Sequence, residues 1–405
     1  MNGLVLAVFG LVYLGMILGR LPGLALDRSG VALLGAIVLV AAGRLPMGQV
    51  DQAVDMPTLA LLFGLMIVSA QFRLGGFYSW VVRRLAALRH SPQVLLAQIV
   101  AVSGVLSSLL ANDIVCLAMA PVLVELCARR GLNPVPYLLG LACAANVGSA
   151  ATLIGNPQNM LIGQVLGLSF PGYLADALAP ATAGLAVVWL VIAGSFRGRW
   201  SASIPVPALD TPPFDLWQTA KGAVVLLGLV AAFLFSSWPR EVAALAGAGL
   251  LLCSRRMRTN RVLALVDWPL LVLFTGLFVV NYCLAQAGLL ARMTGGLADL
   301  GVDLGHPAWL FGASAALSNL VSNVPAVMLL LPSATGPGGG AVLALSSTLA
   351  GNLFIVGSIA NIIVVDQAAR LGVRISWGQH ARVGVPVTLI TLALAAGWLW
   401  LRQAA

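Results

Sequence analysis

Four short groups of polar residues interrupt an otherwise apolar chain, and each also contains residues that disfavour a continuous helix. The groups are Ala111-Asn112-Asp113, Gly155-Asn156-Pro157-Gln158-Asn159, Ser322-Asn323-Val324-Pro325 and Gly357-Ser358-Ile359-Ala360-Asn361. Asn and Gln side chains both donate and accept hydrogen bonds, and they stay neutral at physiological pH. A site built from them suits a neutral polyol-like solute or an oxyanion.

The candidate binding residues are the amides and hydroxyls of these groups and of their near neighbours. They are Asn112, Asn146, Thr152, Asn156, Gln158, Asn159, Ser322, Asn323, Asn352, Ser358 and Asn361. Taken alone, each amide has an alternative role, which is to join helices or to cap broken backbone. The matched places of Asn112 and Asn323, and of Asn146 and Asn352, favour a functional role for these four.

Asp113 is the acidic residue of these groups, and the corresponding place in the second half of the chain holds the apolar Val324. An unpaired carboxylate at membrane depth is costly. A carboxyl that is protonated in one state and ionised in another suits the proton carrier of an antiporter. The alternative, compatible with the first, is that Asp113 caps the helix that follows it.

Sulfur and imidazole groups give weaker signals. Cys116 lies one helical turn after Asn112, and a thiol there would suit a metalloid, although buried packing is the commoner role of cysteine. His90, His306 and His380 fall in predicted loops and form no ligand constellation. The five cysteines have no paired spacing, so we expect no disulfide framework, no metal site and no cofactor.

Other charged residues have structural interpretations. Glu125 precedes Arg129 and Arg130, and is expected to form a surface salt bridge. Asp366 and Arg370 have the i,i+4 spacing of a helical ion pair.

The elements that must position these groups are repeated. Four residues recur with one offset of 212, namely Arg28, Asp55, Pro57 and Gly64 as Arg240, Asp267, Pro269 and Gly276. Asp55 and Asp267 each stand two residues before a proline, which is typical of an N-cap followed by Pro in the first turn. The chain is therefore predicted to contain two related halves.

Composition sets the class of protein. The chain has 405 residues, of which 60% are hydrophobic and 9% charged, so it is an integral membrane protein. Apolar runs long enough to span lie near 3–19, 29–43, 57–72, 179–196, 221–237, 241–254, 268–285 and 383–401. The first run has no basic flank and is expected to be a span, not a removable signal. The net charge of +9 reflects arginines between apolar runs, which set topology and not nucleic-acid binding.

Arginine-rich loops are expected on the cytoplasmic side, which places both termini outside. Because both flanks of 91–127 are basic, this segment must enter the membrane and return on the same side, as a re-entrant hairpin. Segment 307–331 is its counterpart from the outside, and segments 135–167 and 340–366 are broken helices. The second break is expected to be the gentler one.

The remaining elements complete the predicted fold class, an all-α polytopic membrane protein. Segment 74–89 is predicted to be an interfacial amphipathic helix with 287–304 as its counterpart. Since the run 57–72 and its copy cross in opposite directions, the repeats are inverted. They cover 1–196 and 221–405, joined by a cytoplasmic linker at 197–220. Each holds three spans, an interfacial helix, a hairpin, a broken helix and a closing span.

These motifs resemble the ion transporter superfamily of arsenite permeases, sodium/dicarboxylate symporters and certain sodium/proton antiporters. Leu109 to Asp113 with Pro121 is similar to the first hairpin of bacterial arsenite efflux permeases. Segments 151–159 and 351–361 are similar to the broken helices of related bacterial anion permeases. The resemblance implies an elevator-type transporter. Its arsenite branch implies efflux of neutral arsenite or antimonite in exchange for protons.

Two departures from the family patterns bear on substrate. The dicarboxylate symporters carry Ser-Asn-Thr at each hairpin, whereas the tips here read Ala111-Asn112-Asp113 and Ser322-Asn323-Val324. The Gly155 to Asn159 motif also differs from that of the best-known arsenite permeases.

Two main functional hypotheses follow. The first is a proton-coupled arsenite and antimonite efflux permease of the cell (inner) membrane. The second is a sodium- or proton-coupled symporter of a carboxylate or inorganic anion. A membrane enzyme is disfavoured because no nucleophile with a paired base appears, and a passive channel because mirrored hairpins suit alternating access. Two partners stay open: a second copy of the chain, since elevator scaffolds commonly dimerise, and a cytoplasmic ATPase subunit at the arginine-rich loops.

Overall fold

The computed structural model describes residues 2–19, 23–87, 90–206 and 212–404. The first half contains α1 (Asn2–Leu18), α2 (Arg28–Ala41), α3 (Val50–Ala53), α4 (Met56–Leu74), α5 (Phe77–Ala87), α6 (Pro92–Leu109), α7 (Asn112–Arg130), α8 (Pro134–Ser149), α9 (Pro157–Val165) and α10 (Phe170–Ser195). The second half contains α11 (Leu216–Phe235), α12 (Arg240–Leu252), α13 (Thr259–Leu263), α14 (Trp268–Gln286), α15 (Leu289–Asp299), α16 (Pro307–Val321), α17 (Asn323–Leu330), α18 (Gly339–Ala350), α19 (Ile359–Arg370) and α20 (Trp377–Ala404). Three 3₁₀ turns and one isolated bridge, between Leu132 and Ser201, complete the regular structure of these ranges.

Six of the described helices, namely α4, α6, α10, α11, α14 and α20, are long and apolar enough to cross a membrane. Large apolar side chains are exposed on the outer helices, such as Leu11 of α1 and Leu227 of α11. Exposed leucines on spanning helices face lipid, which solvates them as well as a protein core does. The chain is a multi-pass membrane protein.

Helices α4 and α14 begin in the same way. Each has 19 residues. The Asp55 carboxylate accepts a hydrogen bond from the Thr58 backbone N–H at 2.8 Å, and the Asp267 carboxylate accepts one from Leu270 at 3.0 Å. The predicted N-caps are confirmed. Helices α5 and α15 keep the same offset of 212, and each has 11 residues.

The two halves pack reciprocally. A Cβ built on Gly64 of α4 would lie 2.8 Å from the Ala244 carbonyl carbon of α12, and one on Gly276 of α14 would lie 2.6 Å from that of Ala32 of α2. Ala32 and Ala244 are themselves separated by 212 (244 − 32 = 212). Only glycine allows backbones to approach so closely. The repeated glycines therefore hold each half against the other.

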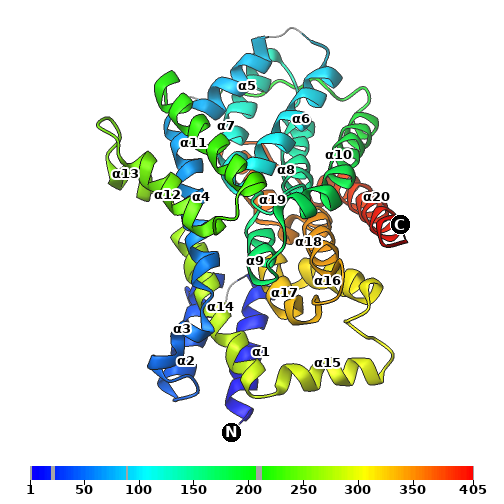
Figure 1. Ribbon diagram of the computed structural model, residues 1–405. Coiled ribbons are helices and arrows are strands. Elements are labelled where there is room, and N and C mark those ends of the chain that lie inside the picture. Colours follow the sequence, from blue (N-terminus) through cyan, green and yellow to red (C-terminus); the bar gives the residue numbers. More distant parts are fainter. Residues whose placement is uncertain (1, 20–22, 88–89, 207–211, 405) are drawn as a thin grey trace.

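Each segment predicted as a re-entrant hairpin forms two helices that meet at the expected tip. Helices α6 and α7 meet at Leu110 and Ala111, and α16 and α17 meet at Ser322. Helix α7 runs to Arg130, three residues past the predicted hairpin end, because Gly131 terminates it in the left-handed region (φ 63°). Figure 1 shows α5 at the top of the molecule and α15 at the bottom, so the two surface helices lie at opposite ends.

Both predicted broken helices are interrupted, but the expectation that the second break is gentler was wrong. The first gap covers 150–156 and the second covers 351–358, which includes a 3₁₀ turn at Ile355–Gly357. Ser358 has extended backbone, and the Asn361 amide donates to the carbonyls of Gly351 (2.9 Å) and Phe354 (3.2 Å). A side chain that satisfies these carbonyls stabilises a full break.

The linker is shorter than predicted. Helix α11 begins at Leu216, inside the predicted linker, because the Asp215 carboxylate caps it by accepting from the Gln218 N–H at 3.1 Å. Residues 207–211 of the proline-rich stretch lie outside the described residues, as do residues 88–89 at the end of the predicted first interfacial helix.

Candidate functional site

Asn146, near the end of α8, is the centre of a buried network between the halves. Its amide nitrogen donates to Asn352 Oδ1 at 2.8 Å and to Asn361 Oδ1 at 3.1 Å. Its amide oxygen accepts from Ser358 Oγ at 2.8 Å and from Asn112 Nδ2 at 3.5 Å. Five predicted residues are therefore joined, and all five are buried.

Thr348, near the end of α18, has the reciprocal position. Its hydroxyl accepts from Asn156 Nδ2 (3.3 Å) and Gln158 Nε2 (3.2 Å), and donates to Asn159 Oδ1 (3.3 Å). Each half therefore presents one helix end to the broken helix of the other half.

These contacts change the correspondence predicted for Asn146. The offset that relates Asn146 to Thr348 also relates Asn156 to Ser358 and Asn159 to Asn361 (348 − 146 = 358 − 156 = 361 − 159 = 202). Asn146 is therefore equivalent to Thr348 in its contacts, and not to Asn352. The reason is that Asn146 lies inside α8, whereas Asn352 follows the end of α18.

The second hairpin tip brings Asn323 to this network, next to Ser322 in the chain. In the orientation that satisfies its neighbours, the Asn323 amide accepts from Gln158 Nε2 at 3.1 Å and donates to the carbonyls of Ser347 (3.1 Å) and Gly357 (3.3 Å). Ser322 has φ 78° and ψ 159°, and it is the one described non-glycine residue with positive φ. A strained residue next to a polar network is typical of a functional site.

The first tip is held by backbone contacts. The Asn112 N–H donates to the Gly155 carbonyl at 3.3 Å, and the Thr152 hydroxyl donates to the Ser108 carbonyl at 2.5 Å. The Thr152 hydroxyl therefore joins the hairpin to the first break, whereas its backbone carbonyl accepts from Asn159 Nδ2 at 3.0 Å, next to the Thr348 centre.

Asp113 lines a small cavity separate from the amide network. With Asp267 it lines a cavity of about 30 Å³, whose other lining residues come from α4, α7, α9 and α14 and are apolar. The cap position of α7 is Ala111, and no side-chain cap bond is formed there. The predicted capping role of Asp113 is therefore wrong, because the residue lies within the first turn of the helix.

Cys116 and Glu125 have structural surroundings away from the amide network. Cys116 is fully buried in the apolar core. Glu125 forms its ion pairs with Arg129 (2.9 Å) and Arg83 (3.6 Å). The predicted salt bridge of Glu125 is confirmed, and the neighbouring Arg130 donates from Nη2 to the His90 carbonyl. The predicted pair of Asp366 and Arg370 is confirmed at 2.8 Å.

His380 was wrongly predicted to lie in a loop. It belongs to α20, is buried, and its Nε2 lies 3.0 Å from the Asn352 carbonyl oxygen. The polar Ser376 and Gln379, with Gly378 between them, gave this segment of the sequence the character of a loop.

Sequence reasoning also missed Thr348, Ser149 and Tyr173. The Ser149 carbonyl and hydroxyl accept from Asn156 Nδ2 (3.3 and 3.0 Å), and the Tyr173 hydroxyl accepts from Asn159 Nδ2 (3.1 Å). Hydroxyl groups inside apolar helices are common, so they gave no distinct signal. The spacing of 202 between the two broken helices would have identified Thr348.

The sequence matches the citrate transporter family over residues 5–350. The chain belongs to this family. It is also 30% identical to an uncharacterized transporter of Mycobacterium tuberculosis, covering 93% of this chain and 94% of that protein. Family members are transporters, so the network described above belongs to a transport protein.

Two further similarities extend over almost the whole chain. A silicon efflux transporter of Oryza sativa is 27% identical, covering 95% of both chains. The crystal structure of the Alcanivorax borkumensis YdaH transporter matches with a TM-score of 0.60 at 16% identity, covering 99% of this chain and 97% of that chain. The second similarity shows that this family member shares the fold of that transporter.

Proposed function

We propose that this protein is a secondary active transporter that expels arsenite or antimonite in exchange for protons. The observation that carries the proposal is the network around Asn146 and Thr348, which is built from neutral amides and hydroxyls at the point where both hairpins and both broken helices meet. Arsenite is a neutral trihydroxide at physiological pH. Amides match its hydroxyl groups because they donate and accept alike.

The charge of the site supports a neutral solute. Among the described residues that form the network, the groups are uncharged amides and hydroxyls, together with the imidazole of His380 at its edge. A citrate-like trianion buried there would need cations or helix N-termini to balance its charge, whereas a neutral solute needs only hydrogen-bonding partners. The Oryza sativa relative is named as an efflux transporter of silicon, and this name supports export of a small hydroxylated solute.

We further propose that the halves are inverted repeats working by an elevator mechanism. The mobile block would comprise the two hairpins and the two broken helices, and α4 and α14 would belong to the scaffold. Support comes from the reciprocal contacts of Gly64 and Gly276. It also comes from two cavities between block and scaffold. One, of about 530 Å³, is lined by residues of α4, α5, α7 and α19. The other, of about 630 Å³, is lined by residues of α3, α4, α9, α14 and α17.

Asp113 is the proposed proton carrier. It stands beside the Asn112 tip and faces a small apolar cavity, where an ionised carboxylate is poorly solvated. Movement of the hairpin would change the solvation of the Asp113 carboxyl group and hence its protonation. Transport of the neutral solute would then be coupled to the proton gradient.

Uptake into everted membrane vesicles tests this proposal. Arsenite uptake should follow an acid-interior gradient and should be lost in Asp113→Asn. Asp55→Asn is the matched control, since it changes the N-cap carboxylate of α4, which lines another cavity. Uptake that follows sodium and ignores Asp113→Asn would contradict the proposal.

The second candidate is a sodium- or proton-coupled anion symporter, and the family match favours it. Arg73 and Arg370 line the cavity of about 530 Å³ and would attract an anion. Proteoliposomes loaded with arsenite, arsenate, sulfate, phosphate, succinate or citrate, under proton or sodium gradients, separate the two candidates. Transport of the carboxylates without arsenite would select the second.

A further inference from the structure

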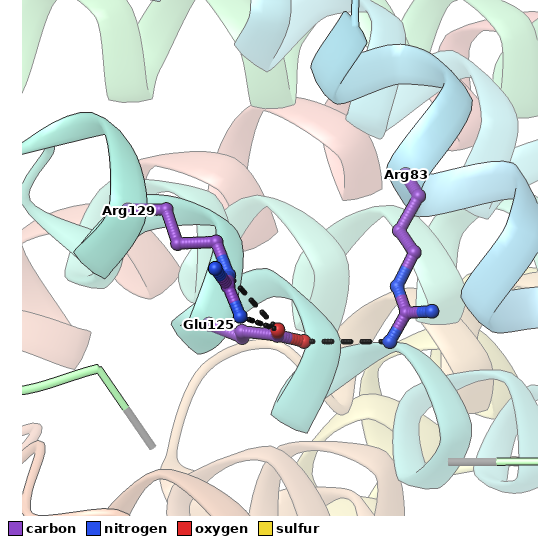
Figure 2. A network of polar contacts seen from close by, with 3 residues as sticks. All are labelled: Arg83, Glu125 and Arg129. Atoms are coloured by element: carbon purple, nitrogen blue, oxygen red, sulfur yellow. Dashed lines mark hydrogen bonds and ion pairs between the residues drawn. The ribbon is translucent and has the colours of Figure 1, made fainter. Parts of the chain in front are cut away.

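A cavity of about 570 Å³ lies between α5 and the end of α7, away from the amide network. Figure 2 shows the side chain of Glu125 between those of Arg129 and Arg83. Arg129 donates to Glu125 Oε1 from Nε (3.0 Å) and Nη2 (2.9 Å), whereas Arg83 Nη2 lies 3.6 Å from Oε2. One carboxylate is therefore shared by two guanidinium groups.

A third arginine increases the positive charge of the same cavity. Arg130 also lines it, and its Nη2 donates to the His90 carbonyl at 3.1 Å. Its Nη1 is buried without a hydrogen-bond partner among the described groups. The described lining residues of the cavity include three guanidinium groups and one carboxylate, so this lining suits an anion with several acceptor oxygens.

The second half of the chain lacks these residues. By the offset of 212 that relates α5 to α15, Arg83 and Arg84 correspond to Gly295 and Gly296. Helix α15 forms without them, so the arginines are not needed to make this helix. Orientation of the protein in the membrane would require positive charge on this side, but not a cavity with a buried, unpaired N–H group.

We propose that this cavity binds a phosphate group, carried either by an anionic lipid headgroup or by a soluble phosphate compound. The planar fork of arginine matches phosphate oxygens in a bidentate manner. The cavity is also lined by Ala87, Val122 and Leu126, which provide apolar contacts next to the charges.

The surroundings of the cavity suit the lipid source. Trp80 of α5 is exposed, and the Arg84 guanidinium lies 5.8 Å from its ring centroid. Tryptophan and arginine on one amphipathic helix are typical of the headgroup region of a bilayer. A bound phosphate would hold α5 to the hairpin helix α7, whichever solute the protein transports.

The test compares thermal unfolding of the full-length protein in nanodiscs of pure phosphatidylcholine and of phosphatidylcholine with phosphatidylglycerol. Native mass spectrometry of the same samples gives the relative lipid affinity. Wild type should unfold at higher temperature with phosphatidylglycerol. Arg83→Gln should weaken phosphatidylglycerol binding about fivefold, since one arginine near an anionic surface contributes about 1 kcal/mol. The Glu125 carboxylate keeps its shorter contact with Arg129 in this variant, so folding is preserved.

Two further variants and one further ligand complete the test. Arg129→Lys keeps the charge but loses the fork, and should also weaken binding. Arg402→Gln, which removes an arginine paired with Asp176 elsewhere, should bind phosphatidylglycerol like wild type. If inorganic phosphate stabilises the detergent-solubilised wild type but not Arg83→Gln, the source is a soluble phosphate. Equal responses of wild type, Arg83→Gln and Arg402→Gln to both ligands would overturn the proposal.

Discussion

Asp113 of α7 and Asp267, the N-cap of α14, line the same cavity of about 30 Å³. The cavity has room for about one water molecule. Two carboxylates that share so small an apolar space repel each other when both are ionised. Asp55 caps α4 in the same way but lines a separate cavity of about 630 Å³. A substitution of Asp55 therefore tests the capping role alone, without the repulsion between Asp267 and Asp113.

We expect Asp267→Asn to stabilise the protein by on the order of 1 kcal/mol at alkaline pH, because it removes this repulsion while asparagine still caps the helix. The gain should shrink at acid pH, where Asp113 is neutral and no repulsion remains to be removed. Thermal unfolding across the pH range measures it. Asp55→Asn should show little pH dependence, and an equal response of both variants would show that the two carboxylates do not interact.

The repeated glycines predict a second result. Gly64→Ala and Gly276→Ala should each destabilise the protein by about 1–3 kcal/mol, since the new methyl groups would meet the backbone of Ala244 and Ala32. Gly249→Ala in α12 is the control, because a Cβ there has no neighbour within 4 Å. It should be neutral or stabilising by about 0.5–1 kcal/mol. Thermal unfolding of the three variants checks the prediction, and similar losses in all three would argue against close helix contact.

The strained backbone of Ser322 predicts that glycine at this position stabilises the protein. Ser322→Gly should stabilise the protein by about 1 kcal/mol, because glycine adopts positive φ at little cost. The first tip has Ala111 at φ −55°, so Ala111→Gly, where no strain exists, should not stabilise. The unfolding temperatures of the two variants and of the wild type check this prediction. If Ser322→Gly destabilises as much as Ala111→Gly, the strain is not stored at this residue.

Asn146→Ala should lower transport at least tenfold and destabilise the protein by about 3 kcal/mol. It removes the shared partner of Asn352, Asn361 and Ser358, and so leaves buried polar groups unsatisfied. Gln71→Ala is the control. It removes a buried amide that donates to Gln218 Oε1 at 2.8 Å, outside the network.

The two variants are distinguished by their kinetics. Gln71→Ala should destabilise while the apparent KM for solute stays near that of wild type. Asn146→Ala should raise the KM. Equal KM values in both variants would place solute binding away from Asn146.

The sequence by itself determined the membrane class, the repeat and the places where helices break. These features depend on local chemistry. Apolar runs of spanning length, Asp before Pro at helix starts, and Asn, Gly and Pro at breaks each act within a few residues, and so Asp55, Asp267 and the two hairpin tips lay where they were predicted.

The tertiary structure alone decided which of the polar residues meet. Asn146 bonds to residues more than 200 positions later (Δ = 206 to Asn352), and local sequence carries no information about such partners. Thr348 and His380 were missed because a hydroxyl or imidazole is informative only when its neighbours are known. The pairing of Asp113 with Asp267 has the same origin, since close packing of α4, α7 and α14 encloses both carboxylates in one cavity.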